Sequence, residues 1–166
     1  LAGDKITYSI KVANTSNVAL ENFFWHDRIP TDVAPASILT TGTYSHRLTY
    51  RVLYKTNYSD YRELASNLLT TNNYSFALNA LPLMAGEAVT DIYFDFGAVP
   101  TGFQTSTKAT LTVSVSPNAT NGYYVTNRAD AGGKYQGTWQ TANSGWVTIV
   151  RRLTPVDPPS LPKTGY

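Results

Sequence analysis

The chain of 166 residues is 42% apolar and 13% aromatic, which excludes a disordered protein and gives enough length for one domain with a real core. A net charge of +2 without a basic block argues against nucleic acid as a partner. The absence of cysteine excludes disulfides, thiolate metal sites and cysteine nucleophiles.

The first segment shows the clearest strand pattern. Apolar residues alternate with polar ones over 6–13, between turn-forming residues at 3–4 and 14–17, and this period of two predicts a strand with one buried face. Lys5 and Lys11 fall on its polar face. The block 18–29 contains three aromatic residues and predicts a second strand, in which the neighbouring His26 and Asp27 face opposite sides and do not form a catalytic dyad.

The middle of the chain predicts a long amphipathic strand over 44–55. Its inner face would consist of Tyr44, His46, Leu48, Tyr50, Val52 and Tyr54, so His46 is expected to be packed inside. The segment 61–69 fits either a short strand or one to two helical turns, and the pattern leaves both open.

Four further segments predict strands. Ile92, Phe94 and Phe96 alternate with polar neighbours, and Asp91 and Asp95 therefore share the opposite face with Tyr93. Alternation over 108–115 predicts another strand, and the segments 123–129 and 146–150 predict the last two.

These elements are separated by Gly, Pro, Asn and Ser turns and show no helical period. The pattern predicts an all-β fold, an antiparallel Ig-like β-sandwich over 1–153, with a closed antiparallel barrel as the alternative. The composition then changes, because Pro155, Pro158 and Pro159 predict a stiff, extended Pro-rich tail over 154–166.

The run GDKITYSIKVANTSNVALENFFWHDRIP resembles the opening of repeat domains that occur in tandem in Gram-positive surface proteins. Those repeats show a Gly-Asp turn, an alternating strand, an Asn-rich turn and a strand that ends in Asp and Pro. The counterpart of their closing strand is 123–129. The resemblance covers 3 to about 130, although only its two ends carry motif-level similarity.

This resemblance implies an internal amide crosslink between a lysine and an asparagine, catalysed by a buried carboxylic acid. Asn127 matches the acceptor and Asp27 the acid, and Lys5 and Lys11 are the lysines available in the first strand. Both lysines lie on its polar face, and in related domains the reactive lysine can precede the Gly-Asp turn. The alternative is that Asn127 has a purely structural role and hydrogen-bonds backbone at a sheet corner.

The last residues carry a second resemblance. Leu161, Pro162, Lys163, Thr164 and Gly165 fit the L-P-x-T-G signal that sortase transpeptidases read in Gram-positive surface proteins. The resemblance implies that sortase, a transient partner, attacks the carbonyl of Thr164 and transfers it to an amine of peptidoglycan. The apolar segment and basic tail that normally follow this signal are not in the sequence, nor is a signal peptide. We therefore expect the natural protein to continue at both ends.

Tyrosine and tryptophan could also form a carbohydrate-binding surface, because flat rings stack on the apolar faces of sugars. Tyr50, Tyr54 and Trp139 are the main candidates, together with Tyr44, Tyr58, Tyr61 and Trp146. The alternative is that these rings occupy half-buried strand positions and bind no ligand.

The sequence as a whole predicts a non-enzymatic structural or adhesive module of an extracellular, wall-anchored surface protein, with a host or glycan ligand as its further partner. A carbohydrate-binding domain and a basal or minor pilin subunit are the alternatives. No nucleophile elbow, paired catalytic carboxylates or metal-ligand spacing appears, so we expect no enzymatic activity, no cofactor and no metal.

Overall fold

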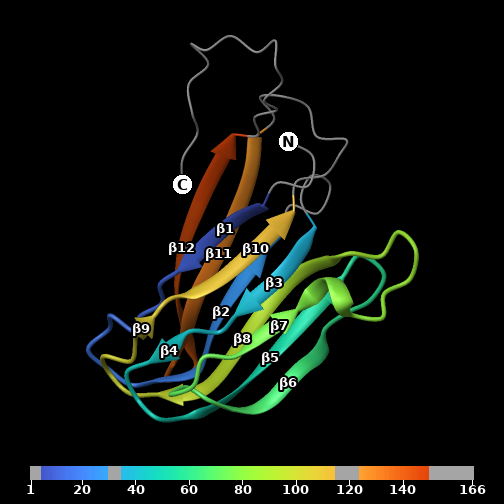
Figure 1. The fold of residues 1–166 in the computed structure, drawn as a ribbon. Coiled ribbons are helices and arrows are strands. Elements are labelled where there is room, and N and C mark those ends of the chain that lie inside the picture. The colour runs from blue at the N-terminus through green and yellow to red at the C-terminus, as the bar shows by residue number, and fades with distance from the viewer. Residues whose placement is uncertain (1–4, 30–34, 115–123, 150–166) are drawn as a thin grey trace.

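The computed structural model describes residues 5–29, 35–114 and 124–149, and in these ranges the protein is all-β with antiparallel sheets (Figure 1). One sheet has six strands, in the order β12 (Thr138–Ile149), β11 (Tyr124–Tyr135), β2 (Leu20–Arg28), β8 (Val89–Val99), β5 (Thr49–Thr56) and β6 (Arg62–Leu69). A second sheet has four, in the order β1 (Lys5–Ile10), β10 (Ala109–Ser114), β3 (Ala36–Thr40) and β7 (Ser75–Ala77). Two short strands, β4 (Thr43–Tyr44) and β9 (Thr105–Thr107), pair separately, and one turn of 3₁₀ helix, η1 (Leu78–Ala80), follows β7.

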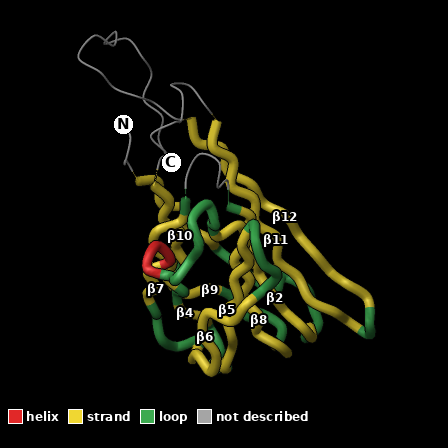
Figure 2. The backbone as a smooth tube through the Cα atoms, turned by 90° about the vertical axis from the view of Figure 1, so that its right-hand side faces the viewer, coloured by secondary structure: helices red, strands yellow, loops and turns green. Residues whose placement is uncertain are grey.

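The two larger sheets lie one in front of the other, and the hydrophobic core draws buried residues from both (Figure 1). The closed barrel is not formed by the described residues, since β12 and β6 remain the two edges of the larger sheet. Viewed from the side, β11 and β12 form a long hairpin along one side of the molecule (Figure 2).

Aromatic rings fill the centre of the core. Trp25 of β2 stacks on Phe94 of β8 with ring centroids 4.0 Å apart. The indole N–H of Trp25 donates a hydrogen bond to the hydroxyl of Tyr44 (3.3 Å), which donates in turn to the carbonyl of Thr41 (2.9 Å). Tyr44 also stacks on Phe103. Burial raises the pKa of Tyr44 far above its usual range, so its hydroxyl stays protonated and can donate. The aromatic residues thus join the larger sheet to the β4 region.

Most predicted strands are confirmed, with two differences in the middle of the chain. The predicted single strand over 44–55 is broken at 45–48, because the N–H of Ser45 donates to the carbonyl of Gln104 and that of Leu48 donates to Thr70 Oγ1. His46 is therefore exposed, and the expectation that it packs inside is wrong. The segment 61–69, for which the sequence left both a strand and a helix open, forms strand β6.

The last two strands are much longer than predicted. They pair from Tyr124↔Ile149 to Tyr135↔Thr138 around a two-residue turn. Gln136 and Gly137 have φ of 49° and 80°, which gives the mirror-image turn that matches the twist of a hairpin. The short strands β3, β7 and β9 were not predicted, because none contains enough alternating residues to give a period.

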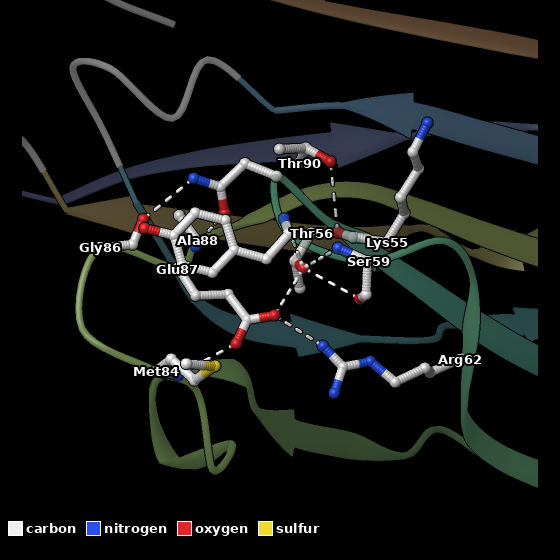
Figure 3. Close-up of polar contacts among 11 residues, drawn as sticks. Lys55, Thr56, Ser59, Arg62, Met84, Gly86, Glu87, Ala88 and Thr90 are labelled. Atoms are coloured by element: carbon white, nitrogen blue, oxygen red, sulfur yellow. Dashed lines mark hydrogen bonds and ion pairs between the residues drawn. The ribbon is translucent and has the colours of Figure 1, made fainter.

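A hydrogen-bonded carboxylate fixes the loop before β8 against the turn between β5 and β6 (Figure 3). Glu87 accepts hydrogen bonds from Thr56 Oγ1 (2.6 Å), the Arg62 guanidinium (2.7 Å) and the N–H of Met84 (3.0 Å). The hydroxyl of Thr56, the N–H of Met84 and the cation of Arg62 all favour the ionised form, so they lower the pKa of Glu87.

Tyr44→Phe tests the hydrogen-bonded aromatic core. The variant leaves the Trp25 indole N–H without its acceptor and the Thr41 carbonyl without its donor, so we expect a loss of about 1–3 kcal/mol in the free energy of unfolding. Urea unfolding measures it. Tyr135→Phe, at an exposed position, is the matched control and should change stability by less than about 0.5 kcal/mol. Equal stability of both variants would contradict this account of the core.

Glu87→Gln tests the charge of this hydrogen-bonded carboxylate. Because the pKa of Glu87 is lowered in the folded state, the ionised group stabilises the wild type above its ordinary pKa of 4.5, and this contribution is lost as pH falls through the lower folded value. We expect Glu87→Gln to unfold at lower urea than the wild type at pH 7, with the difference shrinking towards pH 3. Glu63→Gln, at an exposed position on β6, should show no such convergence. A difference that is constant with pH would exclude the charge as its cause.

Candidate binding face on the six-stranded sheet

The six-stranded sheet has one face against the core and one face towards solvent. Along β2, Phe23, Trp25 and Asp27 are buried and the residues between them face outward, as the period of two requires. The solvent side, which we call the outer face, gathers Phe24, His26, Arg28, Arg51, Tyr61, Asp91, Tyr93, Asp95, Asp130 and Trp139. These residues come from five strands, β2, β5, β8, β11 and β12, and from the turn between β5 and β6.

A polar network centred on His26 crosses three strands of the outer face. Its Nε2 lies 2.6 Å from Asp91 Oδ2 and 3.2 Å from the hydroxyl of Tyr61. Asp130 on β11 lies 3.8 Å from the other ring nitrogen and pairs with Arg28 at 2.8 Å. Partial burial alone would raise the pKa of Asp91, but hydrogen bonds from His26 and Thr90, together with the charges of His26 and Lys55, outweigh it and leave this pKa below its usual value. Asp91 is therefore ionised at neutral pH.

Aromatic side chains lie directly beside this network. Phe24 and Tyr93 stack with centroids 5.2 Å apart and planes 7° from parallel, and Trp139 of β12 meets Phe24 edge-on at 5.7 Å. Trp139 is 48% exposed, and Lys134 lies over its ring at 4.9 Å. Burial raises the pKa of Tyr61 to about 12 and also raises that of Tyr93, so both phenols are neutral hydrogen-bonding groups at pH 7.

A shallow depression of about 260 Å³ continues the outer face towards β5 and β6. Arg51 and Asp95 line it and form an ion pair of 2.9 Å between Nε and Oδ2. The other residues that line it are Thr49, Tyr50, Ser66, Asn67, Phe96 and Gly97. Because Asp95 pairs across strands with Phe24, the depression and the aromatic rings are adjacent.

The predicted glycan contacts are only partly available at this surface. Tyr50 and Tyr54 are 4% and 6% exposed and face the core, which corrects the prediction for these two residues. Burial raises the pKa of Tyr50 to about 12. Trp139 is at the surface. Sequence reasoning missed Phe24 as a surface residue, although the shared face of Asp91, Tyr93 and Asp95 was predicted.

Of the residues of the implied crosslink, Asp27 lies in the core and both lysines lie at the surface. Asp27 is fully buried on β2, and its backbone pairs with that of Ala129, two positions along β11 from Asn127. Lys5 and Lys11 are both exposed. The side chain of Asn127 lies outside the described residues, as does the whole segment 150–166 with the sorting motif.

Comparisons with known proteins include a distant similarity to a solved structure. No family model matches the chain, and no curated protein matches it. One similar solved structure is AvmM, described as catalysing macrocyclization in alchivemycin A biosynthesis, with 11% identity and a TM-score of 0.38 over 96% of this chain and 85% of that chain. This similarity is too distant to decide whether the present chain is an enzyme.

Neither a metal site nor a membrane-spanning helix is found within the described ranges. No group of three or more His, Asp or Glu residues there could hold a metal ion. No helix in that part of the chain is long and apolar enough to cross a membrane. The outer face is thus described by its aromatic, hydrogen-bonding and ion-paired residues.

The exposure of both lysines gives a prediction for the crosslink. A Lys–Asn amide releases ammonia, about 17 Da, and needs a lysine inside the core, so we expect intact-mass spectrometry to give the unshifted mass of the chain. Lys5→Ala and Lys11→Ala should differ from the wild type only by the mass of the substitution. A wild-type mass lower by about 17 Da, restored by Asp27→Ala, would contradict this prediction.

Proposed function

We propose that this chain is a non-enzymatic structural and adhesive module of an extracellular surface protein, with an Ig-like β-sandwich fold and covalent attachment to peptidoglycan through Thr164. The antiparallel sheets with a shared core support the sandwich. The Leu-Pro-Lys-Thr-Gly sequence at 161–165, following three prolines within 154–159, supports the anchor and an extended spacer.

The observation that carries the adhesive part is the outer face. Its aromatic rings, ion pairs and histidine project from β2, β8 and β11, which are paired strands and hold side chains in fixed positions. Binding surfaces often combine exposed aromatic residues with arginine and surrounding polar groups, and this face has all three. A ligand would therefore meet a preorganised surface.

The carbohydrate-binding alternative changes form in this structure. Binding through Tyr50 and Tyr54 has no support because both are buried, whereas Trp139 and its neighbours on the outer face are accessible. We therefore place any ligand of the module on the outer face.

Thr164→Ala tests the anchor. In the proposed reaction the sortase cysteine bonds to the carbonyl carbon of Thr164 as the Thr164–Gly165 bond breaks, and the amine of an acceptor then replaces the cysteine. With a sortase and a fluorescent oligoglycine amine, the wild type should become labelled and lose Gly165 and Tyr166 by mass. Thr164→Ala should not be labelled, while the control Thr154→Ala should react like the wild type. An unlabelled wild type or a labelled Thr164→Ala variant would refute the anchor.

A further inference from the structure

The depression on the outer face arises from backbone irregularities in neighbouring strands. Gly97 in β8 has φ of +67°, and a Cβ built on it would meet nothing within 4 Å, so the space above it stays open. Asn67 in β6 has φ of +54°, next to a register shift between β5 and β6. Such bulges are frequent beside binding sites, because they redirect side chains without disrupting the sheet. The positive φ at Gly97 also keeps this position without a side chain.

The volume of the depression limits the size of the group that can enter it. Its volume of about 260 Å³ lies just below the roughly 300–1,000 Å³ of pockets for drug-sized molecules. It is also shallow and open, so a single small ring can enter while the rest of a larger ligand stays outside. This geometry suits one terminal unit of a longer molecule.

The polar groups of the depression are preorganised. Asp95 accepts the Nε–H of Arg51 at one oxygen (2.9 Å) and the N–H of Gly97 at the other (3.1 Å), which fixes the plane of its carboxylate. This contact uses one of the five N–H donors of Arg51, whose side chain is 52% exposed. A carboxylate beside a guanidinium places a hydrogen-bond acceptor and a hydrogen-bond donor next to each other. Adjacent hydroxyl groups, each both donor and acceptor, complement such a pair.

The aromatic residues supply the second requirement. Phe24 stands beside Asp95 and is stacked with Tyr93, and Trp139 extends the rings away from the depression. Ring faces carry partial negative charge and attract the polarised C–H groups of an apolar surface. A ligand with hydroxyls on one side and C–H groups on another therefore matches both parts of the surface.

The paired charges at the depression favour a neutral ligand. The carboxylate that lines the depression is paired, Asp95 with Arg51, and Asp130 on the same face is paired with Arg28. Such compensated pairs produce little net field, so neither a phosphate nor a carboxylate group of a ligand would gain much from them. Hydrogen bonding and ring stacking remain as the main sources of affinity.

We propose that this depression, with the Phe24–Tyr93 stack beside it, binds the terminal neutral pyranose of a glycan. Arg51 and Asp95 bind adjacent hydroxyls, and the aromatic residues contact the apolar face of the sugar and the next unit. This inference rests on the proposed adhesive function and names the ligand class of its surface.

The test uses the full chain on an array of glycans with neutral ends (glucose, galactose, mannose and N-acetylglucosamine) and with sialylated or sulfated ends. We expect binding to at least one neutral end, followed by chemical-shift changes confined to the outer face when the matching methyl pyranoside is titrated. Arg51→Ala and Phe24→Ala should each weaken binding about tenfold or more. Trp139→Ala replaces Phe24→Ala if the latter does not fold.

Matched controls separate this site from a general loss of binding. Arg47→Ala and Tyr135→Ala remove an exposed arginine and an exposed tyrosine elsewhere, and both should bind like the wild type. The proposal would be overturned if Arg51→Ala and the aromatic variant both bound like the wild type, or if the chain bound only anionic ends or no glycan at all. Chemical-shift changes that come from self-association would overturn it as well. The assay does not involve sortase, so its failure leaves the anchor intact, and failure of the Thr164 reaction leaves the glycan result intact.

Discussion

The packing of aromatic rings between the two sheets is the interaction on which the rest of this structure depends. The chain has no cysteine and therefore no disulfide bond, so the burial of apolar side chains must hold the two sheets together. Trp25 is central to this packing, since it stacks on Phe94 and donates to Tyr44. Its hydrogen bond matters because a buried indole N–H without an acceptor would cost part of the stability that its burial provides.

The same strand that supports the core also builds the candidate binding face. Because side chains alternate along β2, fixing Phe23, Trp25 and Asp27 inside fixes Phe24, His26 and Arg28 outside. Any slip of β2 by one residue would exchange the two sets, which the buried aromatic rings prevent. The core thus sets the register of the outer face, and the ion pairs between β2, β8 and β11 hold its side chains in place.

The strands with strong alternation could be predicted from the sequence, as could the shared face of Asp91, Tyr93 and Asp95. The break at 45–48 could not, because it depends on hydrogen bonds to residues 70 and 104, far along the chain. The length of the β11–β12 hairpin was also missed, since Gly132 and Gly133 interrupt the apolar pattern while their backbone still pairs. Tyr50 and Tyr54 were assigned correctly to the inner face, and only their availability to a glycan was misjudged.

The sequence by itself determined the all-β class, the inner and outer faces of the strongest strands, and the position of the Leu-Pro-Lys-Thr-Gly motif. These features depend on neighbouring residues and on a period of two, which can be read locally. Only the tertiary structure decided that Phe24 stacks on Tyr93 and that Arg51 forms an ion pair with Asp95 near the unfilled space at Gly97. Strand order sets these contacts, and it is decided by how all the strands together bury their apolar faces, a property that no single segment contains.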